Sequence, residues 1–121
     1  MSNPAQHHKI TYIEFTTTDI ERTKKFYGAV FGWSFKDWGP DYIDCNAGNS
    51  GIAIGFAKGV APQEQPKYAP FVVLYSSDLK ATEAAIEAAG GSITVPTFEF
   101  PGGRRFHFSD GVGNLLGVWS E

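Results

Sequence analysis

Residues 10–32 read ITYIEFTTTDIERTKKFYGAVFG, and residues 69–90 read APFVVLYSSDLKATEAAIEAAG. Each segment is an apolar run, then an aspartate at the start of a helical pattern, then a glycine where that pattern ends. The two aspartates, Asp19 and Asp78, are 59 positions apart (78 − 19) in a chain of 121 residues, so two copies fill the chain. A repeat on this scale predicts two like modules with a cleft between them.

The composition is that of one packed globular domain. At 13.2 kDa the chain can bury a hydrophobic core, and 42% hydrophobic residues, with 15% aromatic, exclude a disordered chain. The net charge is −3 and the basic residues are scattered, which argues against a nucleic-acid partner. The single cysteine, Cys45, fits a reducing compartment. Because no apolar run reaches membrane length, we expect a cytoplasmic protein without a membrane partner.

Periodicity and turn residues predict the secondary structure of both modules. Thr18–Glu21 has the pattern of a capping box, with Asp19 as a competing cap, and Gly32 ends the first helix. The expected elements of the first module are a strand at 10–15, a helix over 19–31, and strands at 33–36, 42–46 and 51–56. Those of the second module are a strand at 71–75, a helix at 78–89, and strands at 92–95, 98–100, 104–109 and 114–119.

The predicted fold is therefore α+β. Residues 1–9 are expected to be a polar tail, 10–57 the first module, 58–68 a linker and 69–121 the second module, all within one domain. We expect the two βαβββ modules to form an open, cup-shaped, antiparallel-rich sheet with both helices on its convex side. One apolar stripe of the first helix comprises Ile20, Tyr27, Val30 and Phe31, and that of the second comprises Leu79 and Ile86. These stripes favour this arrangement, because each helix has one face to bury.

Two motifs resemble the vicinal oxygen chelate superfamily, which includes glyoxalases, bleomycin resistance proteins and extradiol dioxygenases. The first is Asp19-Ile20-Glu21-Arg22, continued by Phe26-Tyr27 and by Val30-Phe31-Gly32-Trp33. The second, Phe108-Ser109-Asp110-Gly111-Val112-Gly113-Asn114, is similar to the motif of the final hairpin, with Gly111 where proline is common. With the repeat, the resemblance covers Ile10 to Ser120 and implies the same fold.

The resemblance also implies where a divalent metal would bind. In catalytic members, His, Glu or Gln side chains lining the cup hold the ion. Here these positions fall on Tyr12, near Phe71, on Gly117 and in the aliphatic strand 51–55, which offer no usual ligand set. We therefore expect no metal and no other cofactor. A displaced pair, Glu14 with His107, remains an alternative, although two donors make a weak site.

Strand alternation predicts which side chains line the cup. If Ile13 and Phe15 face the helix, Tyr12 and Glu14 point the other way. The last strand likewise turns Leu116 and Val118 inward and leaves Leu115, Gly117 and Trp119 toward the cup. The candidate ligand-binding residues are Tyr12, Glu14, Trp38, Tyr42, Phe71, Arg105, His107 and Trp119. Aromatic walls with a few polar anchors suit a small aromatic or apolar molecule.

Each candidate also has an ordinary structural interpretation. Glu14 could pair with Arg104 or Arg105, and a strand histidine such as His107 is more often structural than a ligand. Trp33 is expected in the core, whereas Trp38, beside a Gly-Pro turn, could be exposed.

Three functions remain open from the sequence. The first is a metal-free small-molecule-binding protein. The second is a glyoxalase-type lyase, isomerase or dioxygenase-like enzyme with a rearranged metal site, and the third is a non-catalytic dimerisation module. The small domain with many aromatic residues also predicts a homodimer.

Overall fold

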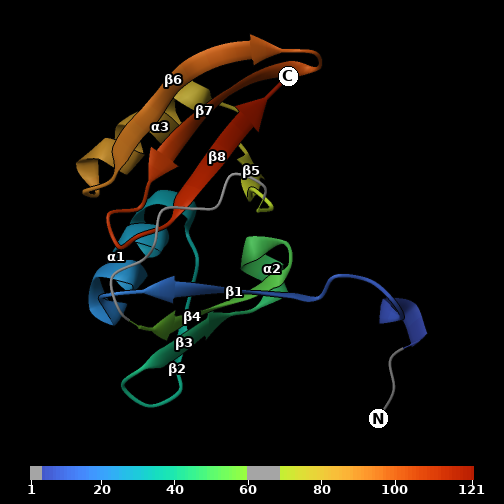
Figure 1. Ribbon diagram of the computed structural model, residues 1–121, viewed down its shortest axis with the longest axis vertical. Helices are drawn as coiled ribbons and strands as arrows, with labels where there is room; N and C mark the ends of the chain where they lie inside the picture. Colours follow the sequence, from blue (N-terminus) through green and yellow to red (C-terminus); the bar gives the residue numbers. More distant parts are fainter. Residues whose placement is uncertain (1–3, 60–68) are drawn as a thin grey trace.

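The two modules predicted from the repeat are present in the computed structural model, which describes residues 4–59 and 69–121 (Figure 1). The elements of the first module are β1 (Tyr12–Thr17), α1 (Ile20–Phe31), β2 (Lys36–Asp37), β3 (Tyr42–Cys45), α2 (Ala47–Ser50) and β4 (Ala53–Lys58). The elements of the second are β5 (Val73–Tyr75), α3 (Leu79–Ala88), β6 (Ser92–Phe100), β7 (Gly103–Ser109) and β8 (Leu115–Ser120).

Each module contributes one mixed four-stranded sheet. The first sheet has the order β1-β4-β3-β2 and the second has β5-β8-β7-β6, so the two orders correspond strand for strand. In each sheet the strand that comes first in the chain, β1 or β5, pairs in parallel with the strand that comes last, β4 or β8. The other strand pairs are antiparallel. The predicted α+β class is confirmed, and the two sheets are not closed into one barrel (Figure 1).

Both helices begin with the same hydrogen bonds. The Asp19 side chain accepts from the Arg22 backbone N–H at 3.1 Å, and Asp78 accepts from that of Ala81 at 3.1 Å. Asp19, rather than Thr18, is therefore the cap of α1. Gly32 ends α1 with φ 73, a left-handed conformation that glycine adopts without strain.

The hydrophobic core joins α1 to both modules. Phe26 and Tyr27 are fully buried on α1; the Tyr27 ring lies 5.0 Å from Phe56 of β4, and the Phe26 ring lies 6.1 Å from Phe108 of β7. The sequence stripe included Tyr27 but missed Phe26. On α3, the predicted inward residues Leu79 and Ile86 are buried as well. Among the described elements, α1 and α3 thus each cover one face of the strands. We refer to the opposite face of each sheet as its uncovered face.

Two strands, β2 and β6, differ most from their predicted bounds. The strand expected at 33–36 is only Lys36–Asp37, because Trp33 is buried against Tyr27 with the rings stacked at 5.0 Å. The strands expected at 92–95 and 98–100 form one strand, β6, with register shifts between Ile93 and Val95 and between Val95 and Phe98. Pro96 lies at this irregularity, since proline cannot donate to the ladder.

The described residues of the predicted tail and linker add little regular structure. Within the predicted tail, Pro4–Gln6 forms one turn of 3-10 helix, η1. Lys58 of the predicted linker ends β4, and residues 60–68 lie outside the described part of the chain. Over residues 4–59 and 69–121, no helix has the length and apolar character needed to cross a membrane.

Candidate functional site

The uncovered face of the first sheet carries a hydrogen-bonded group of three side chains, Tyr12, Glu14 and Tyr42, which we call the tyrosine–glutamate face. The Tyr42 hydroxyl donates to Glu14 Oε1 at 3.0 Å, and it also bonds the Tyr12 hydroxyl. Because Tyr42 gives its proton to Glu14, Tyr12 donates to Tyr42. The free lone pairs of Tyr12 and of Glu14 then face outward as acceptors.

Gly55 of β4 makes room for this group. A Cβ atom at this position would overlap both tyrosine hydroxyls, so only glycine lets the two rings meet over the strand. Burial raises the pKa of Tyr42 well above its usual value, and the bonds to Tyr12 and Glu14 act in the same direction. Tyr42 therefore stays protonated at neutral pH.

The uncovered face of the second sheet is aromatic around one cation. We call it the aromatic–arginine face; it comprises Phe71, Phe98, Phe100, Arg105, His107 and Trp119. Strand pairing fixes its layout, because Arg105 of β7 lies opposite Trp119 of β8 on one side and Phe98 of β6 on the other. Alternation along β7 places the neighbouring residues, Arg104 and Phe106, on the opposite face.

Arg105 is half-buried among rings, and none of the described residues supplies a counter-ion. Its guanidinium carbon lies 5.4 Å from the Phe98 ring, 5.7 Å from Phe100 and 5.9 Å from Phe71. Its buried Nε has no hydrogen-bond partner, and no carboxylate of the described residues forms an ion pair with it. Beside it lies an open pocket of about 430 Å³, lined by Val73, Phe100, Pro101, Gly102, Arg105 and Trp119.

His107 lies two residues further along β7, against the ring of Phe71 at 4.6 Å and that of Phe98 at 5.5 Å. Its buried Nε2 also lacks a hydrogen-bond partner. Burial, together with the charge of Arg105, lowers the pKa of His107 below its usual value. At neutral pH the positive charge of this face thus belongs to Arg105.

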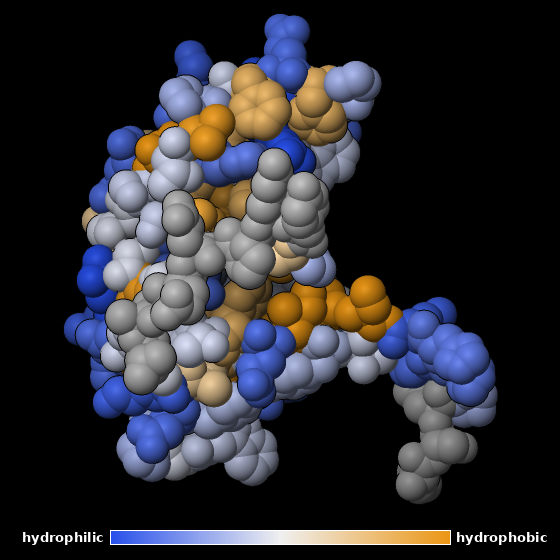
Figure 2. Space-filling model, viewed as in Figure 1, coloured by the Kyte–Doolittle hydropathy of each residue, from blue (hydrophilic) through white to orange (hydrophobic). Residues whose placement is uncertain are grey.

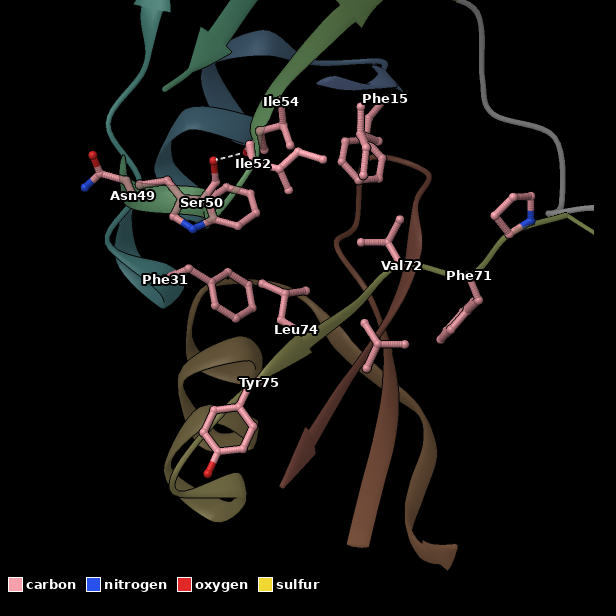
Figure 3. Close-up of a pocket in the computed structure, with 14 residues that line it drawn as sticks. Phe15, Phe31, Asn49, Ser50, Ile52, Ile54, Phe71, Val72, Leu74 and Tyr75 are labelled. Carbon is pink, nitrogen blue, oxygen red and sulfur yellow. Dashed lines mark hydrogen bonds between the residues drawn. The ribbon is translucent and has the colours of Figure 1, made fainter. Parts of the chain in front are cut away.

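A second pocket lies between the modules, where the repeat predicts a cleft, but of its lining residues only Phe71 was among the predicted site residues. It has a volume of about 620 Å³ and is lined on one side by Ile13, Phe15 and Ile54, on the helix side of the first sheet, and on the other by residues 70–75. Figure 3 shows Leu74 of β5 directed toward Phe31 at the end of α1, with Ile52 and Ile54 across the gap. Figure 2 shows a hollow on this side of the molecule, with hydrophobic residues exposed over the start of β1. Sequence reasoning predicted a cleft between the modules but missed most of its lining residues, because strand alternation does not encode how the two modules are placed relative to each other.

The predicted site residues therefore fall into three places. Tyr12, Glu14 and Tyr42 form one group, and Phe71, Arg105, His107 and Trp119 belong to the other. None of the described hydrogen bonds and ring contacts of these side chains joins the two groups. Trp38 stands apart: it is 54% exposed, with the Lys36 ammonium 4.0 Å from its ring centre. The predicted facing of β8 is confirmed, because Leu116 and Val118 are fully buried and Leu115 is exposed.

The positions where the resemblance would place metal ligands hold rings and glycines. A Cβ atom at Gly117 would lie 2.9 Å from Phe71 Cε2 and 3.4 Å from His107 Cδ2, so the Phe71 ring fills the space of the side chain that Gly117 lacks. Among the described residues, no group of three or more His, Cys, Asp or Glu side chains is arranged to hold an ion. This donor set does not fit a divalent metal, which needs several converging oxygen or imidazole ligands.

Two comparisons with known sequences show which family of proteins the chain is similar to. The family model described as the Glyoxalase/Bleomycin resistance protein/Dioxygenase superfamily matches residues 9–118. A glyoxylase-like domain-containing protein of Didymella fabae is 32% identical over 119 residues, covering 87% of this chain and 89% of that protein.

Solved structures share the fold. A glyoxalase-related enzyme of Fulvimarina pelagi has a TM-score of 0.71 at 22% identity and covers 93% of this chain and 87% of its own. The fosfomycin resistance protein FosX of Listeria monocytogenes has a TM-score of 0.77 at 18% identity, with 93% of this chain and 89% of that chain covered. That protein was solved, as a mutant, with Mn(II) and a dihydroxypropylphosphonic acid. At these identities the structural likeness concerns the fold alone.

Proposed function

The chain belongs to the glyoxalase/bleomycin resistance protein/dioxygenase superfamily, and from that premise we propose that it binds a small aromatic or apolar molecule without the aid of a metal ion. The observation that carries the proposal is the aromatic–arginine face of the second sheet. Its rings offer flat apolar surface, and two of its buried polar atoms, Arg105 Nε and His107 Nε2, have no hydrogen-bond partner among the described residues. Ligand sites in proteins commonly combine these two features.

The shape of this face favours a planar ligand. The Trp119 ring meets Phe100 at 6.3 Å and Tyr75 at 5.1 Å, both edge to face, so the indole presents one flank to the adjoining pocket. Aromatic rings gain most from offset-stacked or edge-on contact with other rings. A pocket of about 430 Å³ has room for a one- or two-ring molecule.

Independence from metal is the second part of the proposal. It rests on the Gly117–Phe71 contact and on the lack of a three-donor group among the described residues. Elemental analysis of purified protein, before and after dialysis against manganese, nickel and zinc, tests it. We expect less than about one tenth of an ion per chain; tight stoichiometric metal would contradict the proposal and favour the enzyme with a rearranged site.

We propose that a second copy of the chain is its partner, in a homodimer. The single cysteine suggests that the protein acts in the cytoplasm. Ile10 is 79% exposed, Tyr75 51% and Leu115 36%, and β1 and β5 lie at the edges of their sheets. Exposed apolar side chains and free strand edges are surfaces that a second copy can cover. Light scattering at micromolar concentration should give twice the mass of the chain, and a monomer mass would contradict this part.

A thermal-shift panel tests binding itself. A ligand that binds only the folded state stabilises it by RT ln(1 + L/Kd), where L is the free ligand concentration, so the melting temperature rises with the logarithm of this concentration once it exceeds Kd. We expect aromatic compounds to raise it and aliphatic compounds of equal size to do so less. A dimer that responds to no compound would favour the non-catalytic dimerisation module.

One observation favours an enzyme as the second candidate. The Tyr12–Tyr42–Glu14 chain links an outward-facing hydroxyl to a carboxylate, and such a chain can pass a proton between a ligand and Glu14. Exchange of an acidic C–H proton of a bound ligand with deuterated water, followed by NMR, would support this candidate if Glu14→Gln abolished it.

A further inference from the structure

We infer that Arg105 is the anchor for an anionic group, so that the ligand of the aromatic–arginine face is an aromatic carboxylate rather than a neutral or cationic molecule. The inference rests on the proposed function, because it names the class of ligand for the same pocket. It starts from one cation that the described protein does not neutralise.

A half-buried cation without a counter-ion is an unusual use of an arginine. Partial burial removes water from the guanidinium, and the lost hydration energy is normally compensated by hydrogen bonds to a carboxylate or to carbonyl oxygens. Here the buried Nε of Arg105 lacks any hydrogen-bond partner. Lys24, by contrast, pairs with Glu21 at 2.7 Å and with Asp37 at 3.1 Å, so the chain does pair its cations where carboxylates are near.

The carboxylate closest in strand register on the same face of the sheet is already engaged; Glu99 pairs in register with Arg104 and so belongs to the opposite face. Glu121 follows Trp119 by two residues and therefore points to the same face of the sheet. Its side chain accepts a hydrogen bond from the Tyr75 hydroxyl, and this bond lowers the pKa of Glu121. Glu121 thus occupies the rim with Tyr75 and leaves Arg105 to an outside anion.

The aromatic rings hold the guanidinium without neutralising it. Phe98, Phe100 and Phe71 surround it at 5.4–5.9 Å, a distance at which ring faces attract a cation. These contacts fix the orientation of the planar guanidinium while its charge persists. An arginine held in this way is prepared for two parallel hydrogen bonds to a carboxylate.

The open side of Arg105 leads to apolar surface. The adjoining pocket of about 430 Å³ has Val73, Phe100, Pro101 and Trp119 in its walls, and Arg105 is the one charged side chain among its lining residues. One positive charge at the edge of an aromatic slot matches a ligand with one negative charge on a ring. His107 does not compete for the anion at neutral pH, since burial and Arg105 lower its pKa.

The strand supplies its own matched control. Arg104, the preceding residue of β7, is exposed on the opposite face and lines a separate pocket of about 440 Å³ with Glu83 and Glu87 of α3. Arg104→Gln and Arg105→Gln remove the same charge from adjacent positions of one strand. Any difference in ligand binding between them comes from the face on which the arginine lies, not from net charge.

The test compares 1-naphthoate with 1-naphthamide, which has the same ring and shape but no charge, by calorimetry and thermal shift at pH 7.5. We expect the wild-type protein to bind the carboxylate at least about tenfold more tightly than the amide, as a charge-assisted bidentate contact provides. Arg105→Gln should erase this preference, Arg105→Lys should keep part of it, and Arg104→Gln should keep all of it.

Each result decides the matter. Equal affinity of the wild-type protein for the two probes would overturn the inference while leaving the proposed aromatic site intact. If neither probe nor any other aromatic compound binds, both the inference and the proposed function fall. Because the wild-type comparison needs no variant, a fold defect in Arg105→Gln, visible as a lower melting temperature without ligand, cannot obscure the outcome.

Discussion

The Tyr27 hydroxyl donates a hydrogen bond to Asp110 Oδ2 at 2.7 Å and so ties α1 of the first module to the β7–β8 turn of the second. Both residues are fully buried. The Asp110 carboxylate also accepts from the backbone N–H groups of Val112 and Asn114, each at 2.9 Å, and from Asn114 Nδ2 at 2.8 Å. A carboxylate with four donors is well compensated for its burial, which is why this charge is tolerated between the modules.

Removal of this contact should weaken the joint between the modules. Tyr27→Phe keeps the ring in the core but takes one donor from a buried carboxylate, so we expect the free energy of unfolding to fall by about 1–3 kcal/mol. Urea denaturation followed by circular dichroism measures the change. Tyr75→Phe is the control, because it removes a surface hydroxyl bound to Glu121 and should alter stability little. An unchanged midpoint in Tyr27→Phe would mean that this hydrogen bond adds nothing to the joint between the modules.

The features that the sequence predicted are those decided within a few residues. Thr17 and Thr23 share a hydrogen bond at 2.7 Å, and Ser76 and Thr82, each 59 positions later, share one at 2.8 Å. The repeat in the amino-acid sequence is therefore also a repeat of side-chain contacts around the N-termini of α1 and α3. Strand facing was predictable for the same reason, since a period of two fixes which side chains of β1 and β8 are buried.

The features that the sequence missed depend on how distant segments meet. Trp33 is not part of the strand expected at 33–36, because its ring stacks on that of Tyr27 in the core. The residues that line the pocket between the modules, Ile13 and Leu74 among them, come together through the way in which the two modules pack. The unpaired state of Arg105 is likewise a tertiary property: the sequence suggested a pairing of Glu14 with Arg104 or Arg105, yet Glu14 bonds Tyr42 on the other sheet.

Stability should depend on pH through His107. Because its pKa in the folded protein lies below the unfolded value of about 6.5, the unfolded chain binds more protons between these two values. Stability should therefore fall as pH drops through about 6.5 toward the folded pKa, and level off below it. His107→Gln should remove this part of the profile. Melting temperatures between pH 5 and 8 measure it; identical profiles for the two proteins would show that the desolvation of His107 is relieved in solution.

Glu14 can be separated from a merely structural role. Glu14→Gln removes the charge that receives the Tyr42 proton but keeps an oxygen acceptor, so we expect stability to change by less than about 1 kcal/mol. Affinity for a ligand carrying an ammonium or hydroxyl group should fall, whereas 1-naphthoate should bind as before. Calorimetry with matched amines and neutral analogues tests this difference. Equal binding of all ligands by wild type and variant would leave Glu14 as a surface partner of Tyr42 only.

The last prediction concerns the space above Gly117. A methyl group there would lie 2.9 Å from Phe71 Cε2, so Gly117→Ala must displace the Phe71 ring from its place beside His107 and Arg105. The displaced atom belongs to a half-buried side chain, and alanine lowers the entropy of the unfolded chain, so we expect the stability to change by no more than about 1 kcal/mol.

Ligand binding should respond to Gly117→Ala far more than stability does. If Phe71 forms one wall of the aromatic site, affinity for a two-ring carboxylate should fall at least about fivefold, while Gly48→Ala, at a glycine with open space around its Cα, should leave affinity unchanged. Calorimetry on the two variants, with melting temperatures as the fold control, makes the comparison. Unaltered affinity in Gly117→Ala would remove Phe71 from the binding surface and confine the ligand to the side of Arg105 that faces Phe100 and Trp119.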